Sequence, residues 1–139
     1  MKSILIAAAL LAGIAFVPSA FADVVKYKVV LTAAATVPPV ASKGTGTADV
    51  SYDTTSKMLS WKVTYKKLSG AVTMAHFHGP AMATENAGPV VDVSKMLKKG
   101  SATLTDPQAA DLAAGKWYLN IHTKKFPAGE IRGQVEKAM

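Results

Sequence analysis

The chain of 139 residues contains no cysteine. This absence excludes disulfide bonds, thiol catalysis, iron–sulfur clusters, and zinc or blue-copper sites that need a cysteine ligand. A domain that lacks all of these links must be stabilised by side-chain packing and backbone hydrogen bonds, or by a bound ion.

Acidic residues are also scarce, with 9 Asp and Glu against 16 Lys and Arg, for a net charge of +7. The scattered lysines are typical of a solvated surface, and the alternative is attraction to an anionic cell surface, a polysaccharide or an acidic protein. Aromatic residues make up only 7% of the chain, and no nucleic-acid motif accompanies them, which disfavours a nucleic-acid partner. No serine elbow or paired carboxylates indicate a hydrolase.

Long apolar runs are missing except at the N-terminus. There a lysine precedes an apolar run of signal-peptide length, and a small-x-small site ends at Ala22. We therefore predict that residues 1–22 are a signal peptide cleaved before Asp23, with an uncleaved N-terminal anchor as the alternative. Residues 23–139 are then a single exported domain, periplasmic or secreted, with no later membrane span.

What the chain has in quantity is alternation of apolar and polar residues, which predicts strands with one buried face. Trp61 and Trp117 fall on apolar faces and are expected in the core. The expected strands cover residues 24–34, 47–52, 58–65, 71–78, 90–93, 100–104, 116–123 and 130–135. These short segments, separated by turn residues, predict an all-β fold: an antiparallel Greek-key β-sandwich or barrel of seven or eight strands with one short helix.

The helix is expected at residues 106–114. Asp106 is the expected N-cap, Pro107 suits the first turn, and Gly115 suits the position just after the helix.

The three histidines of the chain are the main chemical feature. His76 and His78 alternate within one predicted strand, so they share a face with Cα atoms roughly 6.5–7 Å apart. His122 lies in a second predicted strand. Three neutral imidazoles suit copper or zinc, and copper(I) can add a thioether from Met74 or Met82. In the alternative interpretation the histidines are structural and fix the loop that follows Gly79-Pro80.

Three segments carry a family resemblance: AHFHGPA at 75–81, GKWYLNIHT at 115–123 and PAGEIRGQV at 127–135. They contain the patterns H-x-H-G-P, N-x-H-T and G-E-I-R-G-Q, and the chain from residue 23 onward resembles the CHRD (chordin-type) domain. The resemblance implies membership of a family without one common activity.

The last predicted strand places Glu130 and Arg132 on one face. We expect an exposed ion pair worth about 0–1 kcal/mol; alternatively, Glu130 orients a histidine or Arg132 attracts an anion to the metal. Gly129 and Gly133 are expected to mark a turn and a close backbone approach.

These features together predict a non-enzymatic module that binds copper, or zinc, through His76, His78 and His122. The second hypothesis is a metal-free structural or interaction domain. The third is a copper-dependent oxidoreductase similar to copper–zinc superoxide dismutase, in which a histidine-x-histidine strand on a Greek-key barrel holds copper. The missing disulfide and the small number of histidines disfavour that enzyme.

Overall fold

The fold is known from a computed structural model that describes residues 12–17, 21 and 23–139. Most of the predicted signal peptide, including its cleavage site, lies outside the described residues. Within the described part, the structure contains no helix with the length and apolar character needed to cross a membrane.

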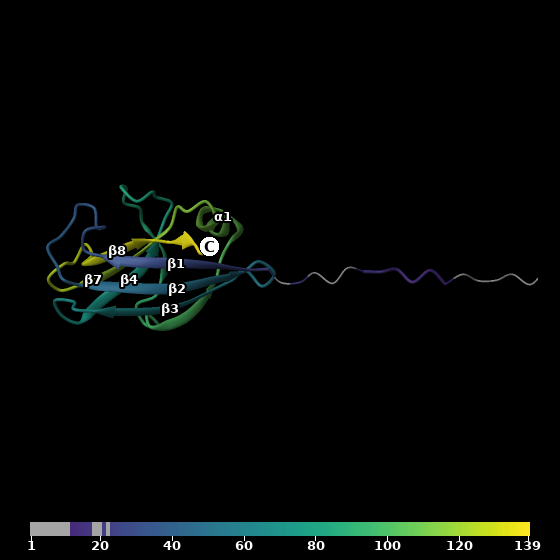
Figure 1. The fold of residues 1–139 in the computed structure, drawn as a ribbon, viewed down its shortest axis with the longest axis horizontal. Helices are drawn as coiled ribbons and strands as arrows, with labels where there is room; N and C mark the ends of the chain where they lie inside the picture. Colours follow the sequence, from purple (N-terminus) through teal and green to yellow (C-terminus); the bar gives the residue numbers. More distant parts are fainter. Residues whose placement is uncertain (1–11, 18–20, 22) are drawn as a thin grey trace, which may run out of the picture.

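Three long strands form an antiparallel meander at the front of the molecule (Figure 1): β1 (Val24–Thr32), β2 (Thr45–Asp53) and β3 (Met58–Lys66). The predicted alternation is confirmed, because Leu59, Trp61 and Val63 on β3 are buried while the residues between them face outward. The Asp53 carboxylate accepts the N–H groups of two following residues and closes the β2–β3 turn.

The remaining strands continue the same sheet. They are β4 (Val72–His78), β5 (Pro89–Asp92), β6 (Lys99–Thr103), β7 (Tyr118–Thr123), β8 (Ile131–Gln134) and β9 (Glu136–Lys137).

The strand order β5-β4-β7-β8-β1-β2-β3-β6 is antiparallel throughout, and β9 adds to β1. A short connection joins the edge strands β5 and β6, so the sheet nearly closes into a barrel. The predicted all-β antiparallel fold with one short helix is therefore confirmed. All strand pairing among the described residues involves the segment 24–137, so residues 23–139 contain the complete barrel.

The helix α1 (Asp106–Ala113) begins as predicted, but its cap differs from the expectation. Thr105 is the N-cap: its hydroxyl accepts the Gln108 N–H, and the Gln108 side chain accepts the Thr105 N–H. The prediction of Asp106 was wrong because this reciprocal capping box satisfies two backbone donors one residue earlier. Gly115 follows the helix with φ +73°, which suits glycine.

Aromatic side chains fill the centre of the barrel. Phe77 meets Trp61 edge-on and lies against Trp117, with ring centroids 5.8 Å apart in both pairs. Both tryptophans are buried, which confirms their predicted place in the core. β7 differs from the other strands because all six of its residues are buried. Its inner face packs in the core, and its outer face is covered by the connections that follow β4 and β7.

Candidate metal centre

The pairing of β4 with β7 brings the three histidines together. In the register His76 lies opposite Asn120 and Met74 lies opposite His122, so the histidines share the outer face of these strands. His76 Nδ1 is 3.4 Å from His122 Nε2, and the His76 and His78 ring centroids are 5.5 Å apart. One nitrogen from each ring lies within 4.8 Å of the other two. All three predicted site residues therefore belong to one cluster.

Backbone carbonyls fix the orientation of two of these rings. His78 Nδ1 lies 2.8 Å from the Ala87 carbonyl oxygen, and His122 Nδ1 lies 2.9 Å from the Pro127 carbonyl oxygen. A carbonyl can only accept, so each Nδ1 carries the proton and each neutral ring keeps a lone pair on Nε2. This is the tautomer in which a histidine binds a metal through Nε2 while its other nitrogen is held by a hydrogen bond.

The dimensions of the cluster fit a single transition-metal ion. The side chains of His78 and His122 are 8% and 7% exposed, and His78 Nε2 is buried without a hydrogen-bond partner. Atoms within 4.8 Å of one another share a point about 2.8 Å or less from each, so inward movements of under ~1 Å give metal–nitrogen bonds of about 2.0–2.1 Å. The unpartnered lone pair supplies a ligand that the protein itself does not use.

Electrostatics keep His76 and His78 in the form that binds metals. Burial lowers the pKa of His76, and the neighbouring His122 lowers it further, against a smaller opposite effect of Asp92. Burial also lowers the pKa of His78 despite the hydrogen bond to Ala87. Both rings are therefore neutral at pH 7, and a cation does not have to displace a proton from the charged form.

A stack of planar groups supports His78 from behind. The Tyr118 ring lies parallel to His78 with centroids 4.8 Å apart, and the guanidinium carbon of Arg132 is 3.5 Å from the Tyr118 centroid. The Tyr118 hydroxyl also bonds the Ala87 backbone at 3.0 Å. The same loop carbonyl thus holds both His78 and the ring stacked on it.

The predicted exposed ion pair of Glu130 and Arg132 was wrong. Their exposed fractions are 0% and 1%, and they bond different partners. Arg132 donates to the carbonyl oxygens of Met82 and Glu85 and to the Asn86 side chain, at 2.7–3.0 Å. It therefore ties the connection after β4 down over the histidine face. Burial lowers the pKa of the Arg132 guanidinium, against a smaller opposite effect of Tyr118.

Glu130 joins three connections at one end of the barrel. Its carboxylate accepts hydrogen bonds from the hydroxyls of Ser42, Ser69 and Thr123 and from the Ser69 N–H, at 2.6–2.8 Å. Burial alone would raise the pKa of this carboxyl, but the four hydrogen bonds outweigh it and lower the pKa. No histidine is among these partners, so its contacts do not match the alternative role of orienting a ring.

We expect Glu130→Gln to destabilise the domain by roughly 1–3 kcal/mol at pH 7, because an amide nitrogen replaces one acceptor of this network. A carboxyl with a lowered folded-state pKa stabilises the fold above its unfolded pKa of about 4.3, and the contribution is lost as the pH falls through the folded value. Urea unfolding between pH 7 and pH 3 should show this loss in the wild type and a flatter profile in the variant. Equal slopes below pH 5 would contradict the assignment.

Sequence reasoning did not find Tyr118, Asn86 or the true role of Arg132. Their importance depends on loops that cover the outer face of β7, and no local pattern shows that cover. The available signal was phase: Tyr118 lies on the same predicted face as His122, directly opposite His78 in the observed register.

A nearly closed antiparallel barrel with three histidines on its outer face defines an all-β domain with a candidate transition-metal centre. The family model for the CHRD domain matches residues 27–135. The chain therefore belongs to the CHRD domain family, as the three sequence segments predicted. The searches of curated proteins and of solved structures gave no match.

Proposed function

We propose that this CHRD domain is a non-enzymatic module that binds one transition-metal ion, copper, through His76, His78 and His122. The observation that carries the proposal is His78 Nε2, a buried lone pair without a partner that lies beside two other imidazoles. We further propose that the domain acts after export, in storage, sensing or buffering of the metal.

Copper is favoured over zinc by the chemistry of the donors. Divalent copper binds nitrogen ligands more tightly than zinc does, and monovalent copper also accepts a thioether. Met74 lies directly across from His122 and two residues from His76, on the histidine-bearing face, and its side chain is 45% exposed. Met74 is therefore the first candidate for a fourth ligand. Met82, in the connection after β4, is the alternative thioether donor.

Met74→Leu tests the thioether. Leucine preserves apolar bulk but removes the sulfur, so we expect copper(I) affinity to fall about 10-fold or more while zinc affinity stays within 2-fold. Competition with a copper(I) chelator under reducing conditions, beside a zinc titration, measures both. Equal affinities for copper(I) in variant and wild type would remove Met74 from the ligand set.

The second candidate function is a metal-free structural or interaction domain. It is favoured by the hydrogen bonds of His78 and His122 to the Ala87 and Pro127 carbonyls, which fix two loops without any ion. A copper-dependent oxidoreductase has the least support, because the chain lacks the disulfide of copper–zinc superoxide dismutase and has too few histidines for a second, imidazole-bridged metal.

Calorimetric titration of the metal-free barrel, residues 23–139, with copper and with zinc tests the proposal. One-to-one binding that also raises the melting temperature is expected, since an ion that binds only the folded state stabilises it. Absence of saturable binding by both metals would leave the structural role as the function of the histidines.

A further inference from the structure

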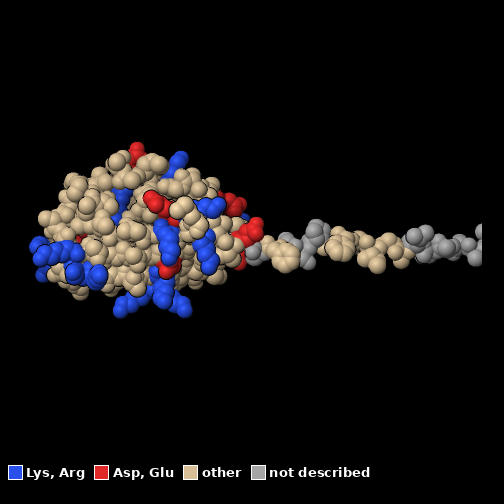
Figure 2. All heavy atoms as spheres, in the orientation of Figure 1, with Lys and Arg blue, Asp and Glu red and all other residues tan. Residues whose placement is uncertain are grey.

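One end of the barrel carries a cluster of lysines from three separate connections and from the last residue of β3. Lys43 precedes β2, Lys66 and Lys67 lie at the end of β3, and Lys124 and Lys125 follow β7. All five side chains are exposed, and none of them belongs to the ion pairs found among the described residues. Figure 2 shows lysine side chains gathered at this end, on the left of the view. We call these five residues the lysine pole.

The lysine pole surrounds a surface hollow. Lys43, Lys67 and Lys125 line a space of about 570 Å³ together with Ser69 and Phe126, so residues far apart in sequence meet there. The acidic side chain beneath this end is Glu130, which is fully buried and committed to its four hydrogen bonds. The pole therefore presents positive charge without a compensating exposed carboxylate among its lining residues.

The opposite end of the barrel has a different charge. Asp53 ends β2 there, and Asp106 pairs with Lys57 across the β2–β3 turn and the start of α1. Acidic atoms are visible at this end on the right of Figure 2. The two ends of the barrel therefore differ in charge, which orients the domain in the field of a charged surface.

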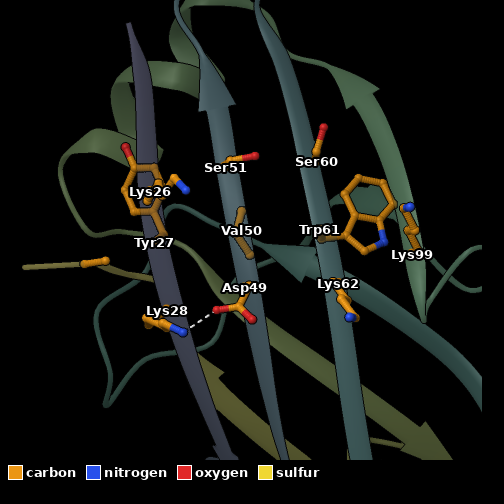
Figure 3. A pocket seen from close by; sticks show the side chains of 11 residues that line it. Lys26, Tyr27, Lys28, Asp49, Val50, Ser51, Ser60, Trp61, Lys62 and Lys99 are labelled. Atoms are coloured by element: carbon orange, nitrogen blue, oxygen red, sulfur yellow. Dashed lines mark hydrogen bonds and ion pairs between the residues drawn. The ribbon is translucent and has the colours of Figure 1, made fainter.

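The outer face of β1, β2 and β3 is less suited to a polyanion, although it carries a pocket that is also lined by lysines. Figure 3 shows that Lys28 and Asp49 form an ion pair in the middle of this face, between Lys26 and Lys62. Asp49 neutralises Lys28, so Lys26, Lys62 and Lys99 are the remaining cations among the residues lining this face, compared with five lysines at the lysine pole.

We propose that the lysine pole docks on the surface of an anionic phospholipid bilayer. Lysine is a flexible, strongly hydrated point charge that attracts phosphate groups without fixed geometry. Clusters of four to eight such cations bind anionic lipid surfaces, with about 1 kcal/mol from each residue near the surface. Three loop tips at one end of a barrel can approach an extended planar surface together. A sugar-binding role is disfavoured because Phe126, the aromatic side chain of the hollow, is half-buried and lies 5.6 Å from the Lys125 ammonium.

Vesicle co-sedimentation of residues 23–139 tests this docking. The probes are vesicles of phosphatidylcholine alone and vesicles of phosphatidylcholine with about one third phosphatidylglycerol. Both are tested at low salt and at roughly 0.5 M salt, where charges are screened beyond a few ångströms. We expect binding only to the anionic vesicles, with loss at high salt. A loss of about 1 kcal/mol per lysine weakens vesicle binding about 5-fold. The triple variant Lys43→Gln/Lys67→Gln/Lys125→Gln is therefore expected to bind anionic vesicles about 100-fold more weakly.

The control variant Lys26→Gln/Lys62→Gln/Lys99→Gln removes the same charge from the sheet face and should bind less than 10-fold more weakly than wild type. Equal losses in both variants would show attraction by net charge alone and overturn the proposal. Binding to neutral vesicles, or no binding to anionic ones, would also overturn it. Retention on immobilised alginate that depends on the lysine pole, without vesicle binding, would assign the pole to an acidic polysaccharide instead. Circular dichroism spectra of both variants verify the fold.

Discussion

Replacing His122 with alanine is expected to abolish one-to-one copper binding, with affinity at least 100-fold below that of the wild type. The removal of an outer hydrogen-bond partner from a metal ligand already costs 10–100-fold, and loss of the ligand itself costs more. The two remaining imidazoles supply only two ligands, and His78 Nε2 then lies beside the volume that the His122 ring had filled. We expect the same result for His78→Ala and His76→Ala.

The measurement must separate metal ligation from loop fixation, because His122 and His78 also hold backbone carbonyls. Each variant is therefore compared with itself, with and without one equivalent of copper, by calorimetry and thermal unfolding. A ligand variant should melt at the same temperature in both conditions, even if that temperature is lower than in the wild type.

Tyr118→Phe is the matched control. It removes the hydroxyl that bonds the Ala87 backbone but keeps all three imidazoles and the ring stacked on His78. We expect copper affinity within about 10-fold of the wild type, in the range of a lost outer partner. Binding that survives in all three histidine variants would falsify the shared site.

Gly133→Ala is expected to destabilise the domain by about 3 kcal/mol or more, or to prevent folding. A Cβ atom at this position would lie 2.2 Å from the Val30 carbonyl oxygen and 2.7 Å from a Val29 methyl group. The obstacle is the backbone of β1, which cannot move without breaking its pairing with β2. The short distance to the Val30 carbonyl oxygen confirms the close backbone approach that the sequence predicts at Gly133.

Gly70→Ala provides the comparison, since a Cβ atom there would have no neighbour within 4 Å. We expect a change of less than about 0.5 kcal/mol, as for an exposed substitution without strain. Urea unfolding of both variants gives the two free energies. A Gly133→Ala protein as stable as Gly70→Ala would contradict the close approach of β8 to β1.

The strand pattern could be predicted because it depends on local chemistry. Alternation of Leu59, Trp61 and Val63 with polar residues determines which side of a strand is buried, whatever its neighbours are. The boundaries shifted by up to two residues, and the helix cap moved from Asp106 to Thr105, since two adjacent polar residues both suit a cap.

The three residues of the candidate site were predicted from the sequence. The i, i+2 spacing puts His76 and His78 on one face in any strand, and His122 is in phase with the outer face of its own strand. Their convergence was a hypothesis, because sequence phase does not say which strands are neighbours. The pairing of β4 with β7, in the register that sets Met74 against His122, decided it.

The sequence by itself determined the all-β class, the apolar core face of strands such as β3, the family and the three histidines, because these follow from local periodicity and short motifs. Only the tertiary structure decided that Glu130 and Arg132 are buried, since connections distant in sequence cover the last strand and supply their hydrogen bonds. It also decided that lysines from three connections meet at one end of the barrel. A charged side chain is expected at the solvent-exposed surface, but the packing of loops determines which positions are exposed.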